Sequence, residues 1–393
     1  MNILYTITSY LPSIGGAQLY LHEIAKRVSR EHRVRVVSFF DSNRTDWLLG
    51  TTLKTTETDK DYAYEGVSVR RIGFTNKEKC KMFLNVGTFY FNKTENMKSI
   101  ASFIENKLAQ YPEKIDIIHN VRVGREPLTY ASYSFARRLN IPFVFTPLHH
   151  PRCDNRFYKE YHALYREADA LIELTPYEKE NYRRLGVNEE RIFVTGTGPV
   201  LSELAKPQNF KDKYGIKNSF ILFIGQGYKY KGLQLLLSAA KILFKNYSNL
   251  SFVFIGPHTD YSRKLFLRVK DPRIIHLGSL DLQEKTDALA ACDIFCLPST
   301  QESFGAVFLE AWAFGKPVIG IDIPQIRCLI KNGQNGFLTK PDAGLLARSI
   351  DALLKDRDLS LKLGMEGRKL GKNFSWDSLS AKTFKAYEYC LSR

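Results

Sequence analysis

Residues 298–317 read PSTQESFGAVFLEAWAFGKP and follow a short apolar segment, Ile294–Leu297, that is typical of a buried strand. The pattern after Ser303 predicts a helix that ends at Gly315, because glycine is common just past the end of a helix and a proline follows soon after. Glu310 stands within this helix among apolar residues. A carboxylate there is costly unless it has a partner, and the hydroxyl groups of a ligand are one such partner.

A second glutamate, Glu302, lies in the loop just before the same helix. The residues Ser303–Ala306 offer free backbone N–H groups beside it, because the first N–H groups of a helix have no partner within the helix. We therefore expect Glu302 at the mouth of a site, Glu310 deeper in it, and an anion between them. The alternative is that both glutamates only pair with basic residues.

Outside this stretch, short apolar segments rich in Val, Ile and Phe alternate with longer helical patterns, as in repeated strand–helix–strand units. In the first half we predict strands at Asn2–Thr8, Val34–Phe40, Val67–Ile72, Asp116–His119, Phe143–Thr146, Ala170–Leu174 and Ile192–Val194. In the second half we predict them at Phe220–Ile224, Ser251–Ile255, Ile274–Leu277, Ile294–Leu297, Pro317–Ile321 and Phe337–Leu338. Two such series predict an α/β protein with two Rossmann-like, doubly wound parallel sheets.

The break between the two series falls at residues 195–199, Thr-Gly-Thr-Gly-Pro, a turn-rich stretch that predicts a hinge. The predicted domains are residues 1–198 and 199–376, followed by a final helix over residues 377–393 that we expect to pack back on the first domain. Residues 51–64 are polar and are predicted to form a loop. Residues 77–98 mix phenylalanines with lysines and predict an irregular helix pair over the sheet; the alternative is a surface for a lipid-linked acceptor.

In each half of the chain, a glycine-containing loop follows the first predicted strand. Gly15 and Gly16 precede an amphipathic helix, where glycine lets backbone amides approach a phosphate, although a tight turn explains them equally well. The loop 225–232 reads GQGYKYKG and contains Lys231. It lies at the carboxyl end of a strand, where open parallel sheets bind ligands, so its lysine is a candidate for neutralising a diphosphate leaving group.

Composition and charge restrict the class of protein. The chain has 393 residues, 44% of them hydrophobic, and a net charge of +16 spread over both halves. This favours anionic partners such as phosphorylated small molecules or an anionic membrane surface, while no RNA-binding or zinc-finger pattern indicates nucleic acid. The apolar start has no basic leader, so we expect a cytoplasmic protein, with membrane association left open. The six cysteines are scattered and predict reduced thiols.

The glutamate pair, its Ser-Phe-Gly and the closing Gly-Lys-Pro-Val resemble the motif of retaining glycosyltransferases with the GT-B fold, the family-4 type (glycosyl transferases group 1). The resemblance extends over nearly the whole chain through Gly15-Gly16, His32/Val34, Ala168-Asp169, Thr175/Glu178, Gly186-Val187, Lys231-Gly232, Glu302/Glu310 and Asn335-Gly336-Phe337-Leu338. It implies two Rossmann-like domains that face a cleft, an N-terminal one on the acceptor side and a C-terminal one that binds the nucleotide sugar.

The resemblance also implies roles for particular residues. Glu310 would hold the ribose hydroxyls, Glu302 the hydroxyls of the transferred sugar, and Lys231 the leaving phosphates. Backbone amides would cradle the diphosphate, and these belong to Ser303, Phe304, Gly305, Ala306 and Val307. His150 occupies the place of the family's active-site histidine, with its neighbour His149 as the alternative.

Two departures from the family pattern concern the same site. Gln226 stands where the family usually has an arginine, so either Lys229 substitutes for it, or the diphosphate is held less strongly, or the chain is a weakened member. Pro324-Gln325 replaces a Gly-Gly, so contacts of that loop cannot be carried over.

The expected reaction is front-face transfer with retention, in which the acceptor hydroxyl attacks from the side that the phosphate leaves, aided by positioning and charge stabilisation. No Asp-x-Asp follows a predicted strand end, so no metal and no cofactor is expected. UDP is the favoured nucleotide and GDP the next, with a saccharide or lipid-linked acceptor for envelope polysaccharide or glycoconjugate synthesis. The alternatives are an oxidoreductase, a synthase that acts on sugar phosphates, and a catalytically weakened scaffold protein.

Overall fold

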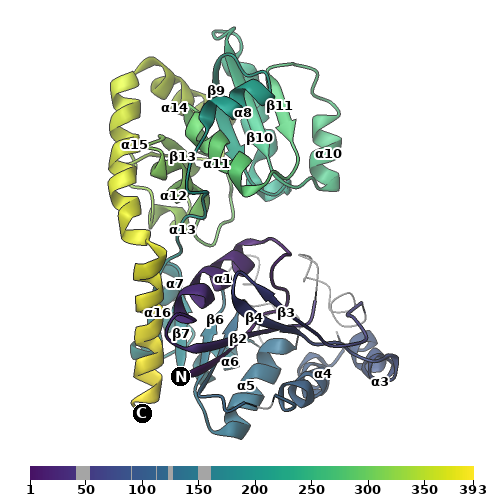
Figure 1. The fold of residues 1–393 in the computed structure, drawn as a ribbon. Coiled ribbons are helices and arrows are strands. Elements are labelled where there is room, and N and C mark those ends of the chain that lie inside the picture. The colour runs from purple at the N-terminus through teal and green to yellow at the C-terminus, as the bar shows by residue number, and fades with distance from the viewer. Residues whose placement is uncertain (41–53, 90, 112, 123–126, 149–160) are drawn as a thin grey trace. The chain divides into compact units, whose positions relative to one another are not determined.

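The structure is a computed structural model of the chain, and it describes residues 1–40, 54–89, 91–111, 113–122, 127–148 and 161–393. The chain divides into two compact units, one of residues 1–196 with 376–393 and one of residues 197–375 (Figure 1). Each unit contains its own sheet, as predicted for a doubly wound α/β protein.

The first unit is built on an eight-stranded sheet in the order β3-β4-β2-β1-β5-β6-β7-β8. Its strands are β1 (Asn2–Thr6), β2 (Arg33–Ser38), β3 (Lys60–Tyr64), β4 (Val67–Arg71), β5 (Ile117–Val121), β6 (Phe143–Thr146), β7 (Ala170–Glu173) and β8 (Ile192–Val194). All neighbouring strands run parallel except β3 and β4. The order reverses between β1 and β5, so the loop after β1 lies at a topological switch point.

Strand β3 corrects the prediction of a loop over residues 51–64. Residues 60–64 pair antiparallel with β4, with Tyr62 opposite Val69, whereas residues 51–53 lie outside the described residues. An edge strand has a neighbour on one side only, and most of this one is exposed. It therefore lacks the apolar run by which the other strands were recognised.

Helices cover both faces of this sheet. Its helices are α1 (Gly16–Val28), α3 (Asn76–Gly87), α4 (Lys93–Leu108), α5 (Leu128–Leu139), α6 (Tyr161–Glu167), α7 (Pro176–Arg184) and α16 (Trp376–Leu391). Leu4 of β1 packs in a core with residues of α3, α4 and α5, while the hydroxyl of the next residue, Tyr5, lies 2.9 Å from that of Tyr387 on α16. Because successive strand residues point to opposite faces, α16 covers the face opposite to α4 and α5 (Figure 1).

The final helix α16 is held by polar contacts in a buried setting. The Tyr387 hydroxyl lies 2.7 Å from Nδ1 of His119, whose Nε2 lies 2.7 Å from the hydroxyl of Thr146. Burial lowers the pKa of His119 to about 3, so this imidazole is neutral in the folded protein at physiological pH. At the start of α16, Arg27 of α1 donates to Asp377 at 2.8 Å.

The second unit is built on a six-stranded, all-parallel sheet in the order β11-β10-β9-β12-β13-β14. Its strands are β9 (Ser219–Ile224), β10 (Leu250–Ile255), β11 (Ile274–Leu277), β12 (Ile294–Leu297), β13 (Val318–Ile321) and β14 (Phe337–Thr339). Its helices are α8 (Pro207–Lys213), α9 (Leu233–Leu243), α10 (Asp260–Phe266), α11 (Leu282–Ala291), α12 (Ala306–Ala313), α13 (Pro324–Arg327), α14 (Ala343–Lys355) and α15 (Arg357–Gly371). All the predicted strands of both units are confirmed.

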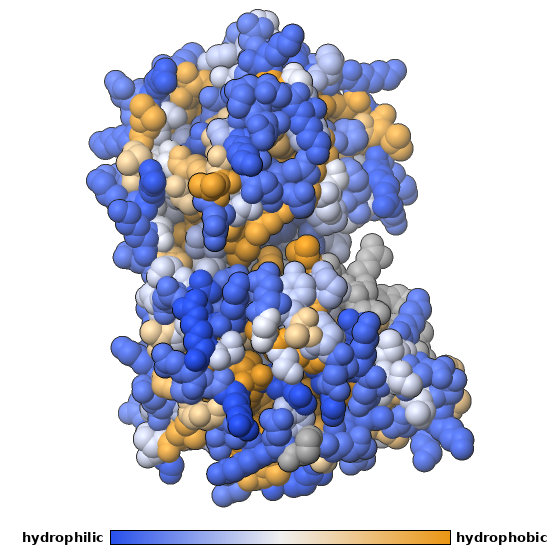
Figure 2. Space-filling model, in the orientation of Figure 1, coloured by the Kyte–Doolittle hydropathy of each residue, from blue (hydrophilic) through white to orange (hydrophobic). Residues whose placement is uncertain are grey.

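On the face in view, hydrophilic residues cover most of the surface of each unit, with apolar residues scattered among them (Figure 2). Among the described helices, none is long and apolar enough to cross a membrane.

Candidate active site

The candidate site lies in the second unit, at the carboxyl ends of two neighbouring strands. Strands β9 and β12 pair directly, with Ile221 opposite Ile294. β10 and β11 continue the sheet beyond β9, and β13 and β14 continue it beyond β12. The strand order reverses between β9 and β12, which is the position where open parallel sheets bind ligands.

The loops that follow these two strands contact each other closely. The amide of Thr300 donates to the carbonyl of Tyr230 at 2.8 Å, and the hydroxyl of Ser299 donates to the same carbonyl at 3.3 Å. Gly232 has φ +80°, and a Cβ placed on it would lie 2.1 Å from the carbonyl oxygen of Pro298. Only glycine therefore allows this approach. The loops 225–232 and 298–305 therefore pack against each other at the carboxyl end of the sheet.

This contact brings two of the predicted site residues together. Lys231 Nζ lies 2.5 Å from Glu302 Oε1. The side chains of Lys231 and Glu302 are 16% and 11% exposed, so both retain an edge that a ligand can reach. An ammonium group has three N–H donors, and the contact with Glu302 uses one of them.

Glu310 lies deeper and has a partner that the sequence did not indicate. Its Oε1 accepts from Lys285 Nζ of α11 at 2.8 Å and from the amide of Val200 at 3.3 Å. Its Oε2 is buried and has no hydrogen-bond partner among the residues that the structure describes. Both glutamates thus pair with lysines, which is what the alternative to a ligand site predicted. However, Oε2 of Glu310 has no partner among the described residues.

The residues expected to cradle a phosphate, 303–307, lie just before α12 and in its first turn. The helix is preceded by Gly305 at φ +84°, and no side chain caps it. Ser303, Ala306 and Val307 are half-buried, whereas Phe304 is buried. The Phe304 ring stands edge-on to Phe374 at 5.5 Å between ring centroids. Residues 303–307 therefore provide backbone N–H groups at an uncapped helix start next to Glu302.

The other predicted site residues are Gln226, Gly15, Gly16 and His150, with Lys229 and His149 as alternatives. Gln226 and Lys229 are exposed in the loop after β9. In the first unit, Gly15 precedes α1, which begins at Gly16 without a side-chain cap. His149 and His150 lie outside the described residues.

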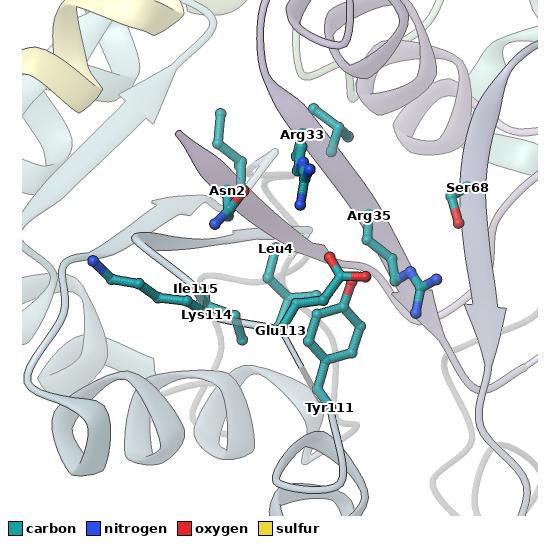
Figure 3. Close-up of a pocket in the computed structure, with 11 residues that line it drawn as sticks. Asn2, Leu4, Arg33, Arg35, Ser68, Tyr111, Glu113, Lys114 and Ile115 are labelled. Atoms are coloured by element: carbon teal, nitrogen blue, oxygen red, sulfur yellow. The ribbon is translucent and has the colours of Figure 1, made fainter.

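A pocket of about 250 Å³ lies elsewhere, in the first unit (Figure 3). It opens at the amino ends of β1, β2 and β4, with Leu4 and Ile115 among its apolar lining residues and Arg33 and Glu113 among its charged ones. Arg35 lies over the ring of Tyr111, 4.9 Å from its centroid. The pocket is at the end of the sheet opposite to the one where parallel sheets bind ligands, and its lining carries both signs of charge. We therefore do not place the donor site there.

Among the described residues, no group of three or more His, Cys, Asp or Glu side chains could hold a metal ion.

A family model of glycosyltransferases matches each of the two units of the chain. The family model described as "Glycosyl transferases group 1" matches residues 207–370. The one described as "Glycosyl transferase 4-like domain" matches residues 15–198. Together the two matches take in most of both sheets and all of the candidate site in the second unit.

Two curated relatives align with less than half of the chain. An uncharacterized glycosyltransferase of Methanocaldococcus jannaschii is 30% identical over 173 residues, 43% of this chain and 48% of the relative. A phosphatidyl-myo-inositol mannosyltransferase of Mycobacterium leprae is 26% identical over 171 residues, 43% of this chain and 46% of the relative. The aligned part of the chain thus spans about half the length of these relatives.

One solved structure resembles the chain over its full length. The structure of HepE of Anabaena in complex with UDP-glucose has a TM-score of 0.74 and 19% sequence identity, and it covers 99% of both chains. At this identity the likeness shows the fold, which is that of two parallel-sheet domains.

Proposed function

Because this chain belongs to the group 1 glycosyltransferases, of the GT4 type, we propose that it transfers a sugar from a nucleoside diphosphate sugar with retention of anomeric configuration. The observation that carries the proposal is the contact between the loops after β9 and β12, which brings Lys231 to Glu302 beside the start of α12. A cation, a carboxylate and free backbone amides at a switch point match the parts of a sugar diphosphate.

Each part of the donor has a candidate partner in the second unit. The unsatisfied Oε2 of Glu310 would accept from the ribose, since an unpaired buried carboxylate oxygen is costly. Lys231, with N–H groups to spare, would bind the diphosphate together with the amides of residues 303–307. Glu302 would accept from hydroxyls of the transferred sugar. Gln226 lies in the same loop and would contribute neutral contacts in place of a second cation.

The proposed chemistry needs positioning and charge stabilisation more than a covalent intermediate. As the bond from sugar to diphosphate loosens, negative charge grows on the leaving phosphates beside Lys231. The acceptor hydroxyl attacks the anomeric carbon from the side on which the phosphate leaves, and its proton passes to the departing phosphate oxygen. We propose His150 near the transferred sugar, Gly15 and Gly16 as further phosphate contacts, and a reaction that needs neither metal nor cofactor.

Donor and acceptor are proposed from relatives. UDP is favoured, since HepE of Anabaena is a structural neighbour solved with UDP-glucose, and GDP comes next. A lipid-linked or saccharide acceptor is proposed in envelope polysaccharide or glycoconjugate synthesis; the mannosyltransferase relative is named for phosphatidyl-myo-inositol.

We also propose a peripheral contact with an anionic membrane through the hairpin of α3 and α4. Phe83, Leu84 and Phe91 are exposed to 56%, 72% and 93%. The exposed lysines Lys81 and Lys98 lie on the same two helices. Apolar side chains flanked by lysines suit the headgroup region of a bilayer.

Calorimetric titration of UDP, GDP and ADP into the protein tests the donor class. We expect one of them to bind with a micromolar dissociation constant, a usual range for enzyme substrates. Proton NMR of the product formed from the matching α-linked sugar donor then tests the stereochemistry. An α-linked product is expected, and a β-linked product would contradict retention.

A second candidate function is a nucleotide-sugar-binding scaffold without turnover, which the exposed Gln226 in place of the family arginine favours. It predicts the same nucleotide binding but no release of UDP from a UDP-sugar, in the presence of acceptor or of water alone. Measured donor turnover above the uncatalysed rate excludes this candidate.

A further inference from the structure

Lys285 of α11 is bound by two acceptors at the site, and it is not among the residues that the family motif marks. Its Nζ donates to Glu310 Oε1 at 2.8 Å and to the carbonyl of Val200 at 2.7 Å. The amide of Val200 donates to the same carboxylate oxygen at 3.3 Å. The side chains of Lys285 and Glu310 are 18% and 6% exposed, so solvent competes little for these contacts.

These contacts make the two oxygens of Glu310 unequal. A carboxylate oxygen offers about two lone-pair positions, and the two donors at Oε1 take both of them. Oε2 is buried and, within the described part of the chain, has no hydrogen-bond partner. The carboxylate therefore presents a single free oxygen, and its orientation is set from the opposite side by Lys285 and Val200.

We propose that Lys285 is a positioning residue that turns Oε2 of Glu310 towards the nucleotide ribose and thereby sets which ribose hydroxyl is recognised. This inference rests on the proposed function, because it assumes a ribonucleotide at Glu310. A glutamate with two free oxygens can pair with both vicinal hydroxyls of a ribose. With Oε1 saturated, both hydroxyls have only Oε2 to share, so one binds in good geometry and the other is left to weaker contacts.

The fold allows Lys285 to be changed without losing the anchoring of this segment. The neighbouring residues of α11 hold the same stretch of chain independently. The amide of Ser202 donates to the hydroxyl of Thr286 at 3.0 Å, and the amide of Lys206 donates to Asp287 Oδ1 at 2.6 Å. We therefore expect Lys285→Met to fold.

The test measures the affinity of the best-binding nucleotide among UDP, GDP and ADP, together with its 2′-deoxy and 3′-deoxy analogues, by calorimetry. In the wild type we expect one analogue to bind about 10-fold or more weakly than the ribonucleotide, as for a lost hydrogen bond to a charged group, and the other to bind with a much smaller loss. In Lys285→Met we expect the difference between the two analogues to fall below about threefold, because Oε1 then has a lone pair for the second hydroxyl. A residue that only supports the fold would weaken all three nucleotides equally.

Lys213→Met is the matched control. It removes another lysine–glutamate pair of α11, that of Lys213 with Glu284, whose lysine is 60% exposed. It should leave the analogue ratios unchanged. If Lys285→Met keeps the wild-type ratios, or if Lys213→Met changes them in the same way, the inference is overturned while the proposed function stands.

Two further outcomes are decisive. If the wild type binds none of UDP, GDP and ADP, the proposed function itself fails, and the inference fails with it. If Lys285→Met does not fold, Lys285→Arg decides: it keeps the charge and two donors, so we expect analogue ratios within about threefold of the wild type. Loss of the ratios in that folded variant would overturn the inference.

Discussion

Glu302 and Lys231 form an ion pair, and this pair has a consequence for the proposed binding of the nucleotide. Each charge neutralises the other at 2.5 Å, so a diphosphate that approaches Lys231 must compete with a carboxylate. A lysine shared in this way is held in position without being withdrawn from the ligand, because two of its three N–H groups stay available. In the proposed site, the pair would orient both side chains for the donor.

Glu302→Gln separates binding from turnover. We expect UDP alone to bind at least as tightly as to the wild type, because Lys231 then lacks a competing negative charge. Sugar transfer should fall by about 10- to 1,000-fold, since a charged acceptor for the sugar hydroxyls is lost. Calorimetry and initial rates measure the two effects. Weaker UDP binding with unchanged turnover would reverse the assignment.

Glu173, at the end of β7, is a buried carboxyl group, and no described residue forms a hydrogen bond with either of its oxygens. Burial raises its pKa well above the usual value, and the nearby Glu178 raises it further. Glu178 accepts at Oε2 from the amides of Leu174 and Thr175, both at 2.9 Å, which favours its ionised form. Glu173 is therefore the protonated member of the pair.

This makes the stability of the first unit depend on pH in a defined direction. The folded state keeps the Glu173 proton to higher pH than the unfolded state does. The contribution is complete below the unfolded pKa and declines as pH rises above it, by up to about 1.4 kcal/mol per pH unit. Glu173→Gln should remove this decline in urea unfolding measured between about pH 5 and pH 8. The control Glu31→Gln, at an exposed glutamate, should keep it, and equal slopes in wild type and Glu173→Gln would refute the assignment.

At the scale of elements, the site depends on how closely two loops approach. Gly232 follows the turn of residues 229–231, and its place under Pro298 permits the contact between Tyr230 and Thr300. These loops belong to different strand–helix units, so their geometry is set by the pairing of β9 with β12.

Gly232→Ala should separate the two loops. We expect a loss of about 2–4 kcal/mol in the free energy of unfolding, from the left-handed backbone and from the clash with Pro298 together, and a weaker binding of UDP. Gly215→Ala is the matched control, because Gly215 has φ +64° with open space around it and should cost only about 1–2 kcal/mol. Equal losses in the two variants would show that the loop contact contributes nothing.

Most of the secondary structure could be predicted because buried parallel strands carry apolar runs that polar loops interrupt. The capping box that starts α7 is also marked in local sequence, by Thr175 and by Glu178 three residues on. The edge strand β3 could not be recognised, because its exposed residues Lys60–Tyr64 carry no such run.

The site was predictable only in part. Glu302, Glu310 and Lys231 stand in motifs, whereas Lys285 lies in an ordinary amphipathic helix pattern beside Glu284 and reads as a solvent-exposed lysine. Its contact with Glu310 arises because α11 packs beside α12, and that proximity leaves no trace in local sequence. The pairing of Lys231 with Glu302, residues 71 positions apart, also depends on tertiary packing, in this case that of the loops after β9 and β12.

At the scale of the whole molecule, the net charge of +16 is spread over the chain, and apolar side chains of α3 and of the turn before α4 are exposed, namely Phe83, Leu84 and Phe91. Spread charge attracts an anionic surface weakly and at long range, while apolar side chains supply the short-range contact. The proposed reversible peripheral contact would need both contributions.

Vesicle co-sedimentation tests this contact. With mixed phosphatidylcholine and phosphatidylglycerol vesicles we expect binding that weakens as salt is raised, and a reduction of about 10-fold or more when Phe83, Leu84 and Phe91 are all replaced by serine. The control Leu267→Ser changes an equally exposed leucine of the second unit, 82% exposed, and should bind like the wild type. Equal binding by the triple variant would exclude this hairpin as the contact.

The most direct test of the central claim is the initial rate of sugar transfer by Glu310→Ala and by Lys231→Ala, with the donor that the wild type uses. If Lys231 and Glu310 bind the two ends of the nucleoside diphosphate, each variant should lose at least about 100-fold in kcat/KM while it remains folded. Wild-type rates in both variants would contradict the account.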